Sequence, residues 1–389
     1  METVSRCTKL VASLSFFTSR SETLPAYKAP WVQSPGWDGF WLHSALWLVP
    51  LTVLLDHTAW SRIYLLALFA VWIAHRFASA WLVFGTSAYA PLRSRDGVRL
   101  RNTLLGVVVL VGVGIFLSGH ILPFNRGEAL LGLLLLDFAL SLHHYAKQHY
   151  GLLQLYGRPT HSGIQDSGHR DQRFCNFVVG VVAFAEILHG TSFLQDSGVL
   201  GYEFFTGVVD GGTAVGCLAV VGGTCWGLWH NRNRSLPNRL YLGGLGLLGV
   251  SAFVVDPILF LMAWTMQHWL ANLGLVVAMS AQDGKTITNN RTLNRQRLGF
   301  TLAGLVLISV ILSPILDVEG AVSAQDSPLA VLPELAAGLA HEPWLGFATV
   351  LALSSGFAHY YLDRVAFRMR DPLTRNCVRS LLNSKNEHE

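Results

Sequence analysis

The chain has 389 residues, of which 51% are hydrophobic and 13% are charged. Soluble domains usually carry about a quarter charged residues, so this composition excludes an ordinary soluble domain and indicates a protein that lies in the lipid bilayer. The net charge of +4 is modest, and basic residues are expected at membrane edges, so we predict no nucleic-acid site.

Apolar segments of about 20 residues are typical of membrane-spanning helices. The chain contains ten such segments, which predict an all-α, polytopic integral membrane helix bundle with about ten transmembrane helices. The seventh and eighth segments meet at Asp256-Pro257, which indicates a tight hairpin. In chain order, the predicted spans are 39–55, 63–84, 103–123, 129–156, 174–193, 207–229, 240–255, 257–280, 298–316 and 344–362.

The basic residues give an independent test of these spans, because cytoplasmic loops are enriched in Lys and Arg. If the N-terminus is cytoplasmic, all basic residues lie on the cytoplasmic side except Arg62 and Arg126, which lie outside, and Arg76 and Lys147, which lie within spans. We therefore expect a multi-pass protein with both termini in the cytoplasm, as in a bacterial inner membrane. The expected organisation is an N-terminal tail over 1–38, a transmembrane domain over 39–363 and a basic tail over 364–389.

Histidines inside the predicted spans are the main functional candidates, because ionisable side chains are costly there. Of the 15 histidines, six lie in the cytoplasmic halves of four spans, and five of them are predicted metal ligands. At a helical rise of about 1.5 Å per residue they form one broad layer, and facing helices of a bundle can bring such groups onto one metal ion. The predicted metal ligands are His75, His144, His149, His268 and His359.

Helical spacing also predicts side chains that support these ligands. Asn272 and Asp363 each lie four residues after a predicted ligand, where an amide or carboxylate can fix the tautomer of the imidazole. Asp363 could equally bind the metal itself. His144 and His149 are separated by about 140° around a helix, so both reach one centre only through a π-bulge. The predicted supporting residues are Asp137, His143, Gln148, Asn272 and Asp363.

Several glycines predict close helix packing. The segment 244–249 matches the G-x-G-x-x-G pattern letter for letter, but it lies inside a predicted span and lacks the preceding strand that a dinucleotide site requires. We therefore assign it to packing between helices. In the sixth span, Gly212 with Gly216 and Gly223 with Gly227 form small-x-x-x-small pairs, which favour close helix contacts.

A second polar group lies at the outer ends of the predicted spans. It comprises His57, His120 and the pair Glu186 and His189. Glu-x-x-His is a ligand spacing of di-iron helix bundles, but the chain has one copy where two are expected. We predict an interfacial role for this group.

The histidines within spans resemble those of His-rich membrane non-haem iron enzymes, namely fatty-acid desaturases and hydroxylases and the Brp/Blh-type β-carotene dioxygenases. The segment Ala358-His359-Tyr360-Tyr361-Leu362-Asp363 is similar to the last helix of those dioxygenases, which contains a histidine and ends in Asp. The resemblance covers only such short segments: the spaced His boxes of the desaturases and the His-Phe-Gly box of the dioxygenases are absent. It implies a class of chemistry, oxidation at a metal ion.

The chemistry of the ligands narrows the expected function. Neutral imidazole suits iron, copper and zinc, and the zinc-peptidase motif H-E-x-x-H is absent. We expect a metal-dependent oxygenase, hydroxylase or desaturase with non-haem iron, and haem or copper as alternatives. Its substrate would be a lipid or isoprenoid that enters from the inner leaflet, and its electrons would come from a separate cytosolic donor. The alternative is a proton-coupled transporter that uses Asp137, Lys147, Arg76 and the histidines.

Overall fold

The computed structural model describes seven stretches of the chain, and all of them belong to the unit Trp31–Glu389. Throughout these stretches the regular secondary structure is helical, without a strand. The all-α prediction is therefore confirmed for this part of the protein. The described residues are 31–55, 61–120, 126–156, 167–196, 202–283, 291–316 and 342–383.

Each of the ten predicted segments coincides with a helix, or in the case of 39–55 with two consecutive helices. Most helices begin before the predicted span, because polar residues at the membrane edge can continue a helix that an apolar segment forms. Two elements lie outside the predicted spans, the 3₁₀ helix η2 (Ser87–Tyr89) and α15 (Pro372–Asn383). The other bounds are α2 (Pro35–Trp41), α3 (Ala45–Leu55), α4 (Ser61–Gly85), α5 (Ala90–His120), α6 (Arg126–Tyr156), α7 (Ser167–Asp196), α8 (Tyr202–His230), α9 (Leu236–Val254), α10 (Pro257–Ser280), α11 (Arg291–Leu316) and α14 (Glu342–Ala366).

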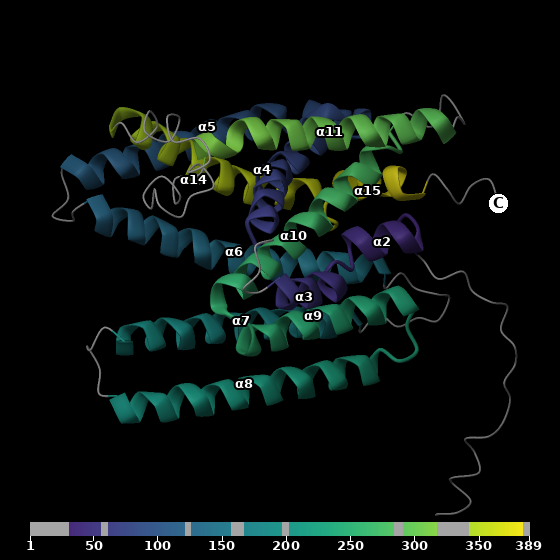
Figure 1. Cartoon of the computed structure of the whole chain (residues 1–389). Coiled ribbons are helices and arrows are strands. Elements are labelled where there is room, and N and C mark those ends of the chain that lie inside the picture. Colours follow the sequence, from purple (N-terminus) through teal and green to yellow (C-terminus); the bar gives the residue numbers. More distant parts are fainter. Residues whose placement is uncertain are drawn as a thin grey trace, which may run out of the picture. The chain divides into compact units, whose positions relative to one another are not determined.

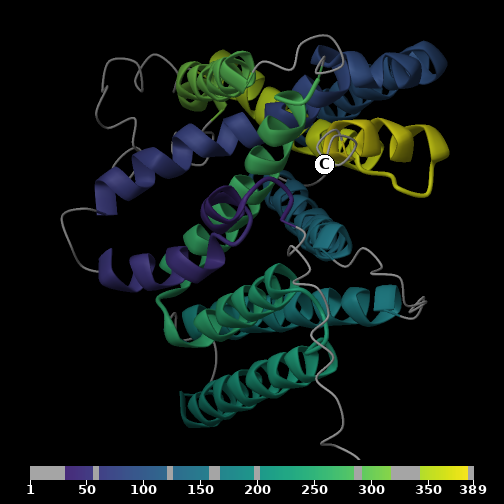
Figure 2. The same cartoon turned by 90° about the vertical axis from the view of Figure 1, so that its right-hand side faces the viewer.

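The helices of this unit lie in layers. In Figure 1, α8 lies at the bottom, α7 and α9 lie above it, and α5, α11 and α14 lie at the top. Helices α4 and α10 run steeply between the outer layers and pack against each other. The same order of layers is visible from the side in Figure 2. The centre of the unit is therefore built from α4 and α10, with α6 and α14 beside them.

The turn between α9 and α10 is the tight hairpin that the sequence predicts. Helix α9 ends at Val254 and α10 begins at Pro257. Asp256 stands between them, and its carboxylate accepts a hydrogen bond from the backbone N–H of Leu259 at 3.2 Å. Proline suits the first turn of a helix and aspartate suits the position before it, so this sequence both ends one helix and starts the next.

The glycine segment 244–249 packs against neighbouring helices, as predicted. It lies within α9, and a methyl group added at Gly246 would overlap the side chain of Thr224 on α8. At Gly249 the added carbon would lie 2.9 Å from Val220, also on α8. A dinucleotide fingerprint is excluded, since the segment is helical and no strand precedes it in the described chain.

Two stretches are long and apolar enough to cross a membrane. The first is Ser87–Phe116, which comprises η2 and most of α5, and the second is Val209–His230 in α8. The bent pair α2 and α3, which meet at 47°, would make a third span. Few residues of these stretches are buried: in the apolar 18-residue window of each, the buried share is 11% for the first and 17% for the second. Within the described residues, the helices of the other predicted spans do not meet both the length and the hydropathy of a membrane span.

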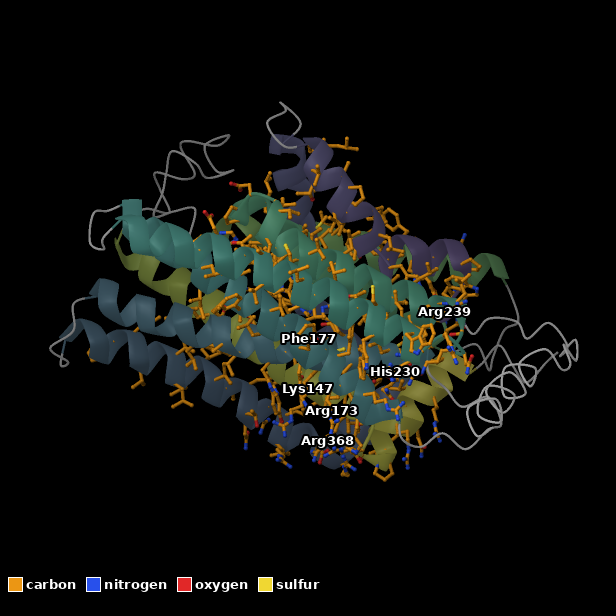
Figure 3. All side chains as sticks on the ribbon, turned by 90° about the horizontal axis from the view of Figure 1, so that it is seen from below. Lys147, Arg173, Phe177, His230, Arg239 and Arg368 are labelled. Atoms are coloured by element: carbon orange, nitrogen blue, oxygen red, sulfur yellow. The ribbon has the colours of Figure 1, made fainter. Side chains whose placement is uncertain are left out.

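Basic and apolar side chains are separated in space. Figure 3 shows nitrogen-rich side chains gathered around Arg173, Arg239 and Arg368, whereas carbon predominates over the left-hand half of the view. Large exposed apolar residues lie on α5 and α8, including Leu110 and Leu218, each 73% exposed. An apolar surface of this extent is unusual on a soluble monomer.

Candidate metal centre

Two histidines face each other between α4 and α14. The Nε2 atoms of His75 on α4 and His359 on α14 are 2.9 Å apart. The Nδ1 atom of His75 lies 2.9 Å from the carbonyl oxygen of Trp72, one turn earlier in α4. Because a carbonyl oxygen only accepts, His75 carries its proton on Nδ1 when neutral and directs the lone pair of Nε2 toward His359.

His268 of α10 and His144 of α6 complete a group of four imidazoles. The ring centre of His268 lies 5.1 Å from that of His75 and 5.0 Å from that of His144. The rings of His144 and His359 are 5.1 Å apart. All four side chains are buried. Four helices that are distant in the sequence therefore bring their imidazoles to one place.

A carboxylate lies beside these rings, that of Asp363, one turn after His359 on α14. Its Oδ2 atom is 3.3 Å from His144 Nε2, and its Oδ1 atom is 3.4 Å from His359 Nδ1. Asn272 of α10 donates Nδ2 to Oδ2 at 3.1 Å, and the hydroxyl of Ser79 on α4 donates to Oδ1. A carboxylate buried this deeply needs a nearby positive charge. His75, His144, His268, His359 and Asp363 are called the histidine cluster below.

Three ring nitrogens of the histidine cluster are buried without a hydrogen-bond partner: His144 Nε2, His268 Nδ1 and His359 Nδ1. Leaving a buried polar atom unpaired costs about 1–3 kcal/mol, and a cation bound between His144, His359 and Asp363 would satisfy nitrogens of both histidines together with the carboxylate. Two triplets have ligand atoms within 4.8 Å of one another, His75 with His268 and His359, and His144 with His359 and Asp363. The cluster can therefore hold a metal ion.

Two of the predicted supporting residues connect the helices that carry the cluster. Gln148 of α6 donates Nε2 to the carbonyl oxygen of His268 on α10 at 3.2 Å. Asp137 of α6 accepts from the hydroxyl of Tyr360 on α14 at 3.2 Å, and this hydroxyl also lies 2.5 Å from the hydroxyl of Ser141. Asp363 lies beside His359, the histidine four residues before it, whereas Asn272 bonds Asp363.

Two predicted site residues stand apart from the cluster. His143 is exposed on α6, because adjacent residues of a helix point about 100° apart and His144 occupies the inward face. His149 is buried, but its Nδ1 atom pairs with the hydroxyl of Tyr241 at 2.7 Å, and it belongs to neither triplet. No π-bulge brings it toward His144, because α6 is an unbroken α-helix over this stretch.

Sequence reasoning missed four residues that contact the cluster, including Tyr360, whose ring centre lies 5.0 Å from that of His144. Ser79 bonds Asp363, and its position four residues after His75 on α4 was a usable signal. The ring centre of Tyr145 lies 4.0 Å from that of His268. Trp269 stacks on His75 with ring centres 5.6 Å apart. Nothing in the helical spacing distinguishes these aromatic residues from ordinary core residues.

The described residues include only part of the outer polar group. His57 and the side chain of His120 lie outside the described residues. His189 of α7 pairs through Nε2 with the carbonyl oxygen of Ala252 on α9 at 3.0 Å. Glu186 has a buried carboxylate oxygen without a hydrogen-bond partner. The histidine of the Glu-x-x-His pair therefore links two helices.

Comparisons with protein-family models, with curated proteins and with solved structures found no match to this chain. The function is therefore inferred from the geometry of the histidine cluster and from the composition of the helices around it.

Proposed function

We propose that the protein is a membrane-embedded, metal-dependent oxidoreductase that acts on a lipid or isoprenoid substrate, with non-haem iron in the histidine cluster. The observation that carries this proposal is the convergence of four buried imidazoles and one carboxylate from α4, α6, α10 and α14. Imidazole combined with carboxylate is a donor set of non-haem iron oxygenases. Bound iron would supply activation of dioxygen and one-electron chemistry.

The spacing of the nitrogens favours a small ion over haem. Two nitrogens bound to one ion at about 2.1 Å and at right angles lie about 3.0 Å apart. The Nε2 atoms of His75 and His359 are 2.9 Å apart, which suits such a pair. Axial ligands of a haem lie on opposite faces of the iron, about 4 Å apart with the macrocycle between them. A bis-histidine haem would therefore require this pair to separate.

The surrounding side chains hold the donors in place. The bond from His75 to the carbonyl of Trp72 keeps the free lone pair of His75 directed inward. Ser79 and Asn272 hold the carboxylate of Asp363 from two different helices. These contacts orient the donors, and the four imidazoles are buried on all four helices.

The apolar exteriors of α5 and α8 support a location in the bilayer, from which an apolar substrate would reach the protein. Both helices expose most of an apolar stretch of spanning length, as lipid-facing helices do. The predicted ten spans and cytoplasmic termini belong to this proposal, because they explain the separation of basic and apolar side chains. We assign the supply of electrons to a separate cytosolic donor.

The transporter alternative receives less support from the positions of its charged residues. Arg76 donates to the carbonyl oxygen of Ala352 at 3.0 Å and to the hydroxyl of Ser355 at 2.9 Å, so it holds α4 against α14. Lys147 is exposed on α6. These two cations therefore have positions that suit packing and surface roles.

The test is oxygen-dependent turnover. Iron-loaded protein in liposomes made from a total cell lipid extract is supplied with dioxygen and a reductant, and lipids are analysed by mass spectrometry. We expect products that have gained oxygen or lost two hydrogens, and we expect none from Asp363→Asn or under nitrogen. Iron-loaded protein that changes no lipid, yet moves protons with a solute across the liposome membrane, would overturn the proposal in favour of a transporter.

A further inference from the structure

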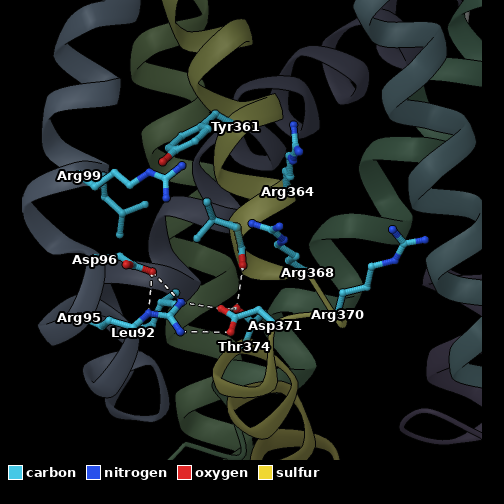
Figure 4. A pocket seen from close by; sticks show the side chains of 12 residues that line it. Leu92, Arg95, Asp96, Arg99, Tyr361, Arg364, Arg368, Arg370, Asp371 and Thr374 are labelled. Carbon is cyan, nitrogen blue, oxygen red and sulfur yellow. Dashed lines mark hydrogen bonds and ion pairs between the residues drawn. The ribbon is translucent and has the colours of Figure 1, made fainter.

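A cavity of about 490 Å³ lies where the first turns of α5 meet the end of α14 and the start of α15. Figure 4 shows it from close by. Its volume is that of a small-molecule site, for which about 300–1,000 Å³ is usual. None of the histidine-cluster residues lines it, so it is a second place where this protein can bind something.

The cavity is strongly basic. One of its arginines, Arg95, forms ion pairs with two aspartates. The distances are 2.6 Å to Asp371 Oδ2 and 2.7 Å to Asp96 Oδ2. Hydrogen bonds from Arg95 lower the pKa of Asp371 to about 2, so this carboxylate stays ionised and paired at neutral pH. The charged residues that line the cavity are Arg95, Arg99, Arg364, Arg368, Arg370, Asp96 and Asp371.

The other arginines lack such partners. The two carboxylates that line the cavity both pair with Arg95. Within the described chain, no hydrogen bond or ion pair joins Arg99, Arg364 or Arg368 to another side chain. In Figure 4, Arg99 from α5 and Arg368 from the turn that follows α14 extend toward the space between these segments. The lining therefore combines five arginines with only two aspartates, so the cavity keeps a net positive charge.

We propose that this cavity binds a phosphate-bearing ligand. Guanidinium groups match the geometry of phosphate oxygens and bind them through paired hydrogen bonds. Tyr361, which also lines the cavity, offers a hydroxyl group to the same ligand, whereas the hydroxyl of Thr374 donates to Asp371 Oδ2 at 3.2 Å. A concave site of this volume suits a small anion, whereas an acidic protein partner would need a broader and flatter basic surface.

Two sources can supply this chemistry, an anionic phospholipid headgroup and a soluble phosphate compound. The lining residues come from the segments 92–100 and 361–374, which lie at or beyond the cytoplasmic ends of predicted spans. Basic pockets at this level of a membrane meet the phosphates of anionic lipids. The same pocket is also open to anions of the cytosol, so the experiment must distinguish the two.

The test compares wild type with the double variant Arg99→Gln/Arg368→Gln, purified in dodecyl maltoside. The matched control is Arg173→Gln/Arg239→Gln, which removes two exposed arginines that do not line the cavity. Native mass spectrometry counts retained phosphatidylglycerol against phosphatidylcholine, and calorimetry measures binding of inorganic phosphate and pyrophosphate. Removing two arginines should weaken binding about 30-fold, since each near-surface arginine contributes roughly fivefold.

Preferential retention of phosphatidylglycerol that the double variant loses would support the proposal and identify a lipid headgroup. Binding of phosphate or pyrophosphate that the double variant loses would support it and identify a soluble ligand. The proposal is overturned if wild type binds none of these probes selectively, or if the control loses binding as strongly as the double variant. Should the double variant fail to fold, Arg368→Gln alone gives the same comparison with an expected fivefold effect.

Discussion

His144→Ala and His143→Ala make a matched pair, because these adjacent histidines of α6 differ in environment. His144 is buried, with Nε2 3.3 Å from Asp363 Oδ2 and without a hydrogen-bond partner. His143 is exposed. If the cluster binds a metal ion, the first change removes a ligand and the second removes a surface side chain of the same type.

The expected loss of metal affinity can be estimated from the cost of changing residues that only support a ligand. Changing a residue that only orients a ligand usually costs about 10–100-fold in metal affinity, so the loss of His144 itself should cost at least about 100-fold. A metal supplied at 100 times the wild-type dissociation constant stabilises the native state by about 2.7 kcal/mol. At the same concentration, a 100-fold weaker site would contribute only about 0.4 kcal/mol.

The stability without metal should change much less. Replacement of His144 by alanine leaves a cavity, which is destabilising. It also removes a buried nitrogen that makes no hydrogen bond and only a 3.3 Å contact with Asp363, and a buried atom without a hydrogen bond costs about 1–3 kcal/mol. These two effects oppose each other, so the metal-free variant should still fold. A packing histidine would show the reverse pattern, with lower stability and an unchanged response to metal.

The assay is thermal unfolding of purified protein with and without added iron(II) under nitrogen, together with metal content by mass spectrometry. We expect wild type and His143→Ala to show the same metal-induced increase in melting temperature, and His144→Ala to lose most of it. Equal metal content and equal stabilisation in both variants would refute the assignment of His144 as a ligand.

Three further changes test separate parts of the account. Asp363→Asn keeps the shape of the side chain but removes its charge, so iron affinity should fall at least about tenfold, measured by competition with a chelator. His149→Phe should leave metal content unchanged and lower stability by roughly 1–3 kcal/mol, since the hydroxyl of Tyr241 loses a buried partner. If this variant lost metal, His149 would have to be counted among the ligands. Gly246→Ala should destabilise the protein by about 1–3 kcal/mol through overlap with α8, whereas Gly243→Ala, with open space beside it, should be neutral in the same thermal assay.

Periodicity and spacing predicted most of the local structure. Segments of spanning length became helices, and Asp256-Pro257 became a hairpin, because these features depend on neighbours in the sequence. The break within the predicted span 39–55 was not foreseen. There α2 and α3 meet at 47°. The start of α2 was not foreseen either: the buried carboxylate of Asp38 accepts hydrogen bonds from the backbone N–H groups of Val32 and Gln33, just before this helix. These contacts involve turn geometry that an apolar pattern does not reveal.

The candidate site was predictable in part for a similar reason. The depth of a histidine in a helix follows from counting residues, so His75, His144, His268 and His359 could be assigned to one layer. Which face of α6 points inward depends on its packing against α10 and α14, and this packing places His144 in the cluster and leaves His143 exposed. Contacts such as that of Tyr145 with His268 depend on the same long-range packing.

The most direct test of the central claim is the metal content of the wild-type protein, combined with X-ray absorption at the edge of the metal that is found. The histidine cluster predicts about one transition-metal ion per chain, with several imidazole ligands and an oxygen ligand in its spectrum. That signal should be lost in Asp363→Asn/His268→Ala but kept in His143→Ala. Protein that is folded, purified from iron-replete cells and free of metal even after incubation with iron(II) would contradict the account.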